Sequence, residues 1–201
     1  MAYKDFSIKD LKAKFGILEV GTELFKPEKI VQGKPSELLK NKIADARYIT
    51  LSSKKAVSAQ LIAPVVVELV KTNEYIQVFA DEYIVGDEAL GLMGEFDFIF
   101  SRRPWMRTPE MPLFCITEAK LGAINKSVDK AAAQMLGIKH YNHKVGLTKE
   151  IIIHGVVTDG TSWRFLKLDG VNLFVDVHVY SVDNLPFLLG AFQEVLNFYK
   201  K

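Results

Sequence analysis

Two short apolar stretches of the sequence carry charged residues that a buried strand rarely contains. Residues 94–101 include Asp97, and residues 114–120 include Glu118 and Lys120. Side chains alternate between the two faces of a strand, so Glu118 and Lys120 share one face. If the two stretches are neighbouring strands, Asp97, Glu118 and Lys120 converge at one end of a sheet.

Such a cluster would suit a metal ion and a phosphate. Charges in apolar strands are costly unless they are paired or bind a metal. Two neighbouring carboxylates repel each other, and Mg2+, with Mn2+ as its substitute, relieves that repulsion. Lys120 would then orient a water molecule or stabilise charge developing on a phosphate. The alternative is a salt bridge between Glu118 and Lys120 at an exposed strand end, because a Glu-x-Lys triplet is common.

Length and composition limit the class of protein. The 201 residues, 49% hydrophobic and 25% charged, fit one soluble α/β or α+β domain. A net charge of +2 is too balanced to indicate nucleic-acid binding by itself. Cys115 has no second cysteine to pair with, which predicts a core thiol in a cytoplasmic protein. No membrane span and no signal peptide are expected, because no apolar run is long enough.

The N-terminal quarter of the chain carries no recognised motif. Residues 5–15 predict a short amphipathic helix that ends at Gly16, and residues 17–20 predict a brief strand. A further helix, capped by Ser36, is predicted to reach about residue 46.

A largely buried helix is predicted over residues 54–72, with a kink at Pro64. Glu68 interrupts its apolar stripe, close to Val57 and Leu61 on the helical wheel. One interpretation makes Glu68 a third carboxylate of the metal site. The other places Glu68 in a frayed last turn, where it reaches solvent.

Residues 74–85 predict a strand that precedes the two charged ones. The segment between the charged strands, residues 101–112, contains three prolines and reads as an extended loop. Its residues suited to a nucleic acid are Arg102, Arg103, Trp105 and Arg107. Guanidinium groups contact a polyanion, and an indole ring stacks on a base. The alternative is an ordinary surface hairpin that carries these side chains without binding a nucleic acid.

A helix is predicted over residues 126–144. Lys130, Gln134 and Tyr141 fall on one polar stripe of this helix, beside an apolar side. The alternative is an ordinary solvated face. His140 and His143, in the same helix, are a weak candidate for a metal pair because no third nitrogen or sulfur ligand is near.

The C-terminal part predicts an antiparallel meander and a closing helix. The strands are residues 150–158, 161–168 and 171–180, with Asp-Gly turns between them. His154 and His178 lie within these strands and are interpreted as core or edge residues. The helix is predicted over residues 187–200, with a core face made of Phe187, Leu188, Ala191, Val195 and Phe198.

The order of these elements resembles the PD-(D/E)XK nuclease superfamily, the restriction-endonuclease-like fold. That order is a helix with an acid, three strands, a helix with glutamine and tyrosine, and a further strand. The resemblance implies an α/β (α+β) fold with a central mixed β-sheet flanked by helices. It covers about residues 54–158 of a single domain, 1–201. An N-terminal helical extension, 1–50, and the C-terminal β-meander and helix, 150–201, lie outside it.

The resemblance also implies roles for individual residues. Asp97 and Glu118 would bind one or two Mg2+ ions, and Lys120 would position or activate the attacking water. Glu68 fits the place of an assisting helix glutamate. Gln134 and Tyr141 look like the glutamine-containing motif that follows the lysine, and Gln134 joins the catalytic set. The chain departs from the family at Phe96, where the name has proline, and in the spacing of seven residues from Gln134 to Tyr141 rather than four.

The sequence therefore predicts a Mg2+-dependent nuclease that hydrolyses DNA phosphodiester bonds. The expected nucleic-acid-binding residues are Arg102, Arg103, Trp105, Arg107, Lys130 and Tyr141. One alternative is a catalytically inactive nuclease-like module that binds nucleic acid or a protein partner. Another is a structural or interaction protein with a surface salt bridge. A homodimer or a partner subunit would fit the nuclease prediction, because paired cuts need two sites.

Overall fold

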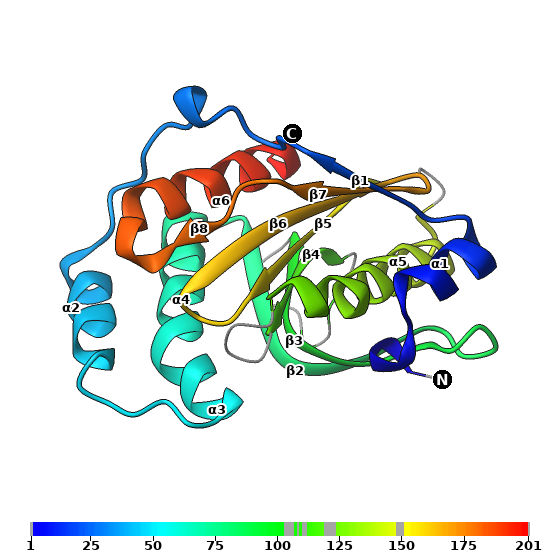
Figure 1. The fold of residues 1–201 in the computed structure, drawn as a ribbon, viewed down its shortest axis with the longest axis horizontal. Helices are drawn as coiled ribbons and strands as arrows, with labels where there is room; N and C mark the ends of the chain where they lie inside the picture. The colour runs from blue at the N-terminus through cyan, green and yellow to red at the C-terminus, as the bar shows by residue number, and fades with distance from the viewer. Residues whose placement is uncertain are drawn as a thin grey trace.

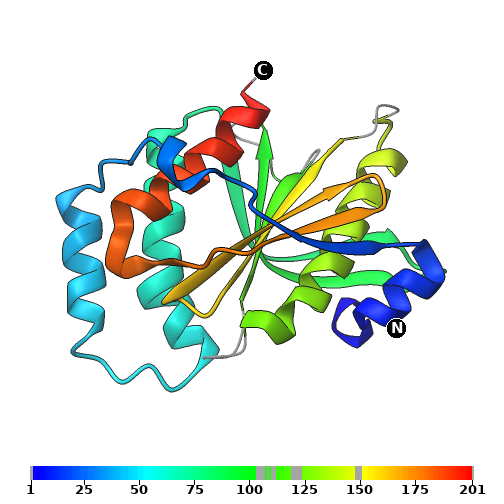
Figure 2. The ribbon, with the colours of Figure 1, turned by 45° about the horizontal axis from the view of Figure 1, so that its top comes forward.

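A computed structural model describes residues 2–102, 107, 109, 112–118, 124–147 and 151–200, with the backbone alone at 112, 113, 117 and 118. Within these residues, eight strands form one twisted mixed sheet between two groups of helices (Figures 1 and 2). Helices α2 (Glu37–Ala46), α4 (Ala63–Thr72) and α6 (Leu185–Tyr199) lie on one side. Helices α1 (Ile8–Phe15) and α5 (Val128–Lys144) lie on the other. The predicted fold class, a mixed sheet flanked by helices, is confirmed.

The strands and the short helices have the following bounds. The strands are β1 (Leu18–Thr22), β2 (Ile76–Asp87), β3 (Leu92–Arg102), β4 (Pro112–Glu118), β5 (Ile153–Thr158), β6 (Ser162–Asp169), β7 (Asn172–Asp176) and β8 (Tyr180–Ser181). The short helices are η1 (Tyr3–Asp5), η2 (Pro27–Lys29), α3 (Lys54–Val57), the π-helical η3 (Ser58–Ile62), η4 (Ile124–Ser127) and η5 (Val182–Asn184).

The sheet has the strand order β1-β7-β6-β5-β4-β3-β2. Strand β3 runs antiparallel to both of its neighbours, β2 and β4. After β4 the chain passes through α5 and returns as β5, which lies parallel to β4. The predicted meander is present in β5, β6 and β7. Its third strand is shorter than expected, because the chain leaves the ladder after Asp176 and pairs with β6 again as β8. The N-terminal segment adds β1, which lies parallel to β7.

The helix predicted over residues 54–72 is present, with a π-helical turn in the middle. The N–H of Ala63 donates to the carbonyl of Ser58, five residues earlier. Pro64 follows directly; it has no N–H to donate, and its ring crowds the carbonyl four residues before it. A widened turn at this point accommodates the proline without ending the helix.

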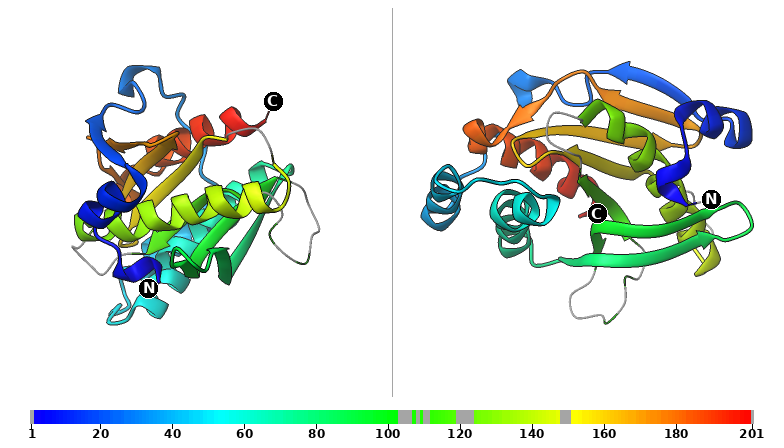
Figure 3. Two further views of the ribbon diagram at one scale, coloured as in Figure 1. Left: turned by 90° about the vertical axis from the view of Figure 1, so that its right-hand side faces the viewer. Right: turned by 60° about the horizontal axis from the view of Figure 1, so that its bottom comes forward.

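Two apolar cores hold the layers together. The first core lies between the sheet and α4 and α6, and the second lies between the sheet and α5. The α5 helix approaches β2 closely at Gly137 and Gly86. A Cβ on Gly86 would overlap the Gly137 carbonyl, and a Cβ on Gly137 would overlap the Tyr3 hydroxyl. Tyr3 is itself buried and donates to the Leu92 carbonyl at 3.0 Å, so η1 is fixed beside the β2–β3 hairpin (Figure 3).

The closing helix begins two residues earlier than predicted, and its core face is partly different. Leu188, Ala191 and Val195 are buried as expected. Phe198 is 47% exposed, whereas the neighbouring Tyr199 is buried against His154. The position of the helix relative to β5 decides this, because the Tyr199 hydroxyl donates to the Ile152 carbonyl at 3.0 Å.

Three further predictions are confirmed by burial and capping. Cys115 forms no disulfide and is buried inside the second core. Ser36 caps α2 by accepting the N–H of Leu39, and Gly16 ends α1 in the left-handed conformation. Among the described residues, we find no helix of the length and apolarity that a bilayer crossing requires.

Candidate functional site

Asp97 lies near the middle of β3 and faces α5. Its Oδ2 atom is 3.3 Å from Nζ of Lys130, in the first turn of α5. Only 23% of the Asp97 side chain and 26% of the Lys130 side chain are exposed. The ion pair is therefore partly buried, where solvent screens it less than at the surface. It joins Asp97, a predicted metal ligand, to Lys130, a predicted nucleic-acid contact.

The polar stripe of α5 faces the strands. Gln134, one turn after Lys130, is fully buried, and its Nε2 donates to the Glu95 carbonyl at 2.9 Å. The Tyr141 hydroxyl donates to the Pro109 carbonyl at 3.0 Å. The solvated-face alternative is therefore wrong for Gln134. Its contact fixes the β3 backbone two residues before Asp97, which is a positioning role.

The strand alternation changes at Asp97. Phe98 and Phe100 lie in the first core, whereas Phe96 lies in the second. The pairs Ala80 with Phe98 and Glu82 with Phe96 flank this point. Between them, opposite Asp97, stands Asp81 with φ +56°, the one non-glycine residue in the described chain with positive φ. Aspartate tolerates this conformation better than most residues. Strict alternation would place Phe96 in the same core as Phe98, whereas Phe96 lies in the other core.

The other two members of the predicted cluster are described in part or not at all. The backbone of Glu118 ends β4 and pairs with Thr158 of β5. Its side chain and the whole of Lys120 lie outside the described residues. The β3–β4 register pairs Phe98 with Ile116, so the backbone of Glu118 lies two residues beyond that pair along β4. The convergence of Asp97, Glu118 and Lys120 stays a prediction.

The described donors fit a Mg2+ site only in part. Asp97 supplies one carboxylate, which is the hard oxygen ligand that Mg2+ prefers. In the part of the chain that the structure describes, no three histidine, cysteine, aspartate or glutamate side chains form a group able to hold a metal ion. A metal at Asp97 would therefore depend on Glu118, or on a phosphate of the substrate, for further ligands.

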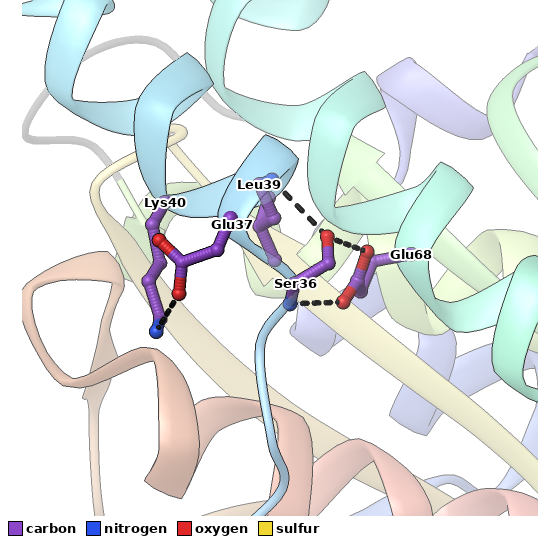
Figure 4. Close-up of polar contacts among 5 residues, drawn as sticks. All are labelled: Ser36, Glu37, Leu39, Lys40 and Glu68. Atoms are coloured by element: carbon purple, nitrogen blue, oxygen red, sulfur yellow. Dashed lines mark hydrogen bonds and ion pairs between the residues drawn. The ribbon is translucent and has the colours of Figure 1, made fainter.

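Glu68 does not reach this site, contrary to the expectation that it is a third carboxylate ligand. Its two oxygens accept hydrogen bonds from Ser36, one from the backbone N–H at 2.6 Å and one from the hydroxyl at 2.8 Å (Figure 4). Glu68 is 8% exposed, so the frayed-turn alternative is wrong as well. It lies in α4, on the side of the sheet opposite α5. The carboxylate fastens the start of α2 to α4.

The arginine-rich loop is described at a few positions. Arg102 and Arg107 are exposed. Arg103 and Trp105 lie outside the described residues. The hydroxyl of Tyr141, a predicted nucleic-acid contact, holds the loop at Pro109. Tyr141 therefore links α5 to the loop.

A pocket of about 430 Å3, which the sequence did not indicate, opens beside Lys130. Its lining includes Tyr3, Lys4, Lys54, Tyr83, Glu95 and Lys130. These residues come from η1, α3, the β2–β3 hairpin and α5, and the hairpin packs against η1 at one end (Figure 3, right). No local spacing connects them, because the fold alone brings the N-terminus to the hairpin.

His154 is a buried core residue and His178 lies at the sheet edge, as predicted. Burial, with a smaller effect of Lys167, lowers the pKa of His154 to about 3, so its ring is neutral. His154 Nδ1 lies 2.7 Å from the Tyr199 hydroxyl. His178 bonds Glu23 at 2.9 Å on the sheet edge. In α5, His140 lies 3.6 Å from Asp87, and burial lowers its pKa.

No model of a known protein family matches the chain, and no curated protein shows significant similarity to it.

Proposed function

We propose that the protein is a Mg2+-dependent nuclease that hydrolyses DNA phosphodiester bonds. Two features support this proposal. The described elements follow the order α4, β2, β3, β4, α5, β5, with a parallel pair formed by the last two strands. This is the order on which the resemblance to the PD-(D/E)XK nucleases depends. The second feature is the partly buried carboxylate of Asp97 in β3.

The observation that carries the proposal is the position of Asp97. A carboxylate in the middle of a strand, three-quarters shielded from solvent, is costly unless a cation or hydrogen-bond donors compensate it. The fold supplies Lys130 from one side and fixes the preceding backbone through Gln134. An acid held in this way is preorganised for a cationic ligand.

The chain's own residues would act as follows. Asp97 and Glu118 would hold the metal, and Lys120 would orient the attacking water. When bound, Mg2+ would lower the pKa of a coordinated water and neutralise charge on the scissile phosphate. Lys130 would place a positive charge next to the same phosphate, and Gln134 would keep the β3 backbone in register. A cytoplasmic location and a homodimer or partner subunit belong to this proposal.

A catalytically inactive binding module is the second candidate. The observation that favours it is the Lys130 ammonium group, which already compensates one oxygen of Asp97. In that case Lys130 stays the partner of the Asp97 carboxylate, and no metal ion takes its place. The two candidates differ in whether a divalent cation binds at Asp97.

The test is a calorimetric titration of Mn2+ into the wild type and into Asp97→Asn, with a supercoiled-plasmid nicking assay on the same samples. Asp87→Asn is the matched control, because Asp87 lies in the same hairpin and also contacts a basic residue of α5, His140. The nuclease proposal expects binding and nicking in the wild type and in the control, and neither in Asp97→Asn. Metal binding that is equal in all three proteins would contradict the nuclease proposal. A wild type that binds no metal would favour the inactive module.

A further inference from the structure

The pocket beside Lys130 has the size and the charge of a site for an anionic ligand. Its volume of about 430 Å3 lies within the range of small-molecule pockets, about 300–1,000 Å3. Three lysines, Lys4, Lys54 and Lys130, are among its lining residues. Glu95 brings one carboxylate to the lining, and Asp97 beside the pocket offsets Lys130, so a small excess of positive charge remains from Lys4 and Lys54.

The same pocket presents an aromatic ring. Tyr83 is 58% exposed, although it lies in the long strand β2. It stands directly opposite Glu95 in the β2–β3 ladder, so both side chains are on one face of the hairpin. An exposed ring beside ammonium groups is the combination that binds single-stranded nucleic acid, with bases stacked on the ring and phosphates near the lysines.

Lys130 connects this pocket to Asp97. It lines the pocket and its Nζ lies 3.3 Å from the Asp97 carboxylate. A DNA strand whose phosphate contacts Lys130 in the pocket therefore lies next to Asp97, the candidate metal ligand. The base next to that phosphate can stack on Tyr83 only if it has left its own base stack.

We propose that this pocket binds one unpaired nucleotide of the DNA strand next to the scissile phosphate, with the phosphate at Lys4, Lys54 and Lys130 and the base on Tyr83. The inference rests on the proposed function and makes it more specific. The substrate is then single-stranded DNA or a frayed duplex end, and an intact duplex binds more weakly.

Binding is measured by fluorescence anisotropy with a short labelled oligothymidylate in EDTA, where no cleavage occurs. The double variant Lys4→Gln/Lys54→Gln is compared with Lys9→Gln/Lys12→Gln, which removes two exposed α1 lysines outside the pocket. The pocket variant is expected to bind at least about tenfold more weakly, with a salt-dependence slope shallower by about 1.4. The matched variant is expected to bind nearly as the wild type does.

Tyr83 gives an independent test. Tyr83→Ala should weaken binding by about five- to a hundredfold, whereas Tyr83→Phe, which keeps the ring, should not. A hairpinned duplex of the same length should bind more weakly than the single strand. The inference would be overturned if the two double lysine variants lost the same affinity, or if Tyr83→Ala bound as the wild type does. It would also be overturned if the duplex bound as tightly as the single strand.

The binding assay also separates this inference from the nuclease proposal. Pocket-dependent binding without Asp97-dependent nicking would support the pocket and contradict the nuclease. Nicking that depends on Asp97, combined with normal binding by the pocket variants, would contradict the pocket alone.

Discussion

The ammonium group of Lys130 lies 3.3 Å from Oδ2 of Asp97, and this contact joins α5 to the centre of β3. The pair has two consequences. Lys130 compensates the charge of Asp97 inside the fold, and it also competes with any other cation for the same oxygen. The ion pair therefore predicts how metal affinity responds when the lysine is removed.

Lys130→Gln is expected to tighten Mn2+ binding, because a positive charge next to the metal is lost. The gain should be at least about 1 kcal/mol, or about fivefold in the dissociation constant. Nicking should fall in the same variant, since the phosphate loses a cationic contact. Calorimetric titration and the plasmid assay measure the two effects. Lys139→Gln is the control, because this α5 lysine donates to the Gly170 carbonyl instead. Weaker Mn2+ binding in Lys130→Gln would rule out the competition.

Glu68→Gln is expected to lower the free energy of unfolding by about 1–3 kcal/mol, because a buried carboxylate loses charged hydrogen bonds to Ser36. Urea unfolding measures the change. Glu37→Gln is the control: Glu37 pairs with Lys40 on the exposed surface of the same region, and its loss should cost less than about 1 kcal/mol. Both variants should still nick plasmid. If Glu68→Gln had normal stability but no longer nicked plasmid, Glu68 would have a role in the metal site after all.

Gly86→Ala is expected to lower the free energy of unfolding by about 1–3 kcal/mol, because the new Cβ overlaps the Gly137 carbonyl and must push α5 away from β2. The control is Gly21→Ala in β1, another strand glycine, whose Cβ would meet only Val177 at 3.9 Å. Urea unfolding of the two variants gives the comparison. If both lose the same stability, the effect belongs to strand glycines in general and not to the contact with α5.

Local patterns predicted most of the fold. The caps at Ser36 and Gly16, the alternation in the meander and the helical stripe of α5 depend on residues close together in sequence. These local signals predict the structure correctly because the tertiary packing favours the same conformations. The π-helical turn before Pro64 was predicted only as a kink, since sequence locates the missing N–H but not how the helix absorbs it.

The candidate site was less predictable, because its contacts join distant segments. A helical wheel shows that Glu68 is anomalous, but it does not show that Ser36, thirty-two residues earlier, will meet it. The pocket beside Lys130 needs η1 to pack on the hairpin, which no periodicity indicates. Asp97 meets Lys130 because β3 and α5 pack together, and the change of alternation at Phe96 depends on the backbone of Asp81.

His154 makes stability depend on pH. Its pKa is lowered from 6.5 to about 3 by burial, so the folded state keeps the ring neutral while the unfolded state takes up a proton below pH 6.5. The contribution of His154 is therefore fully present above pH 6.5 and is lost as the pH falls from there toward about 3. The free energy of unfolding should fall by about 1.4 kcal/mol per pH unit from this group, or about 2 kcal/mol between pH 6.5 and about pH 5.

His154→Asn removes the titrating ring and keeps a polar group within reach of the Tyr199 hydroxyl. The variant should be less stable than the wild type at neutral pH, and the difference should shrink by about 2 kcal/mol at about pH 5. Urea unfolding at both pH values measures it. Phe198→Leu is the control, because Phe198 packs against the same ring without titrating, and it should keep the wild-type slope. If the stability of His154→Asn falls with pH in parallel with the wild type, the histidine already accepts a proton in the folded state.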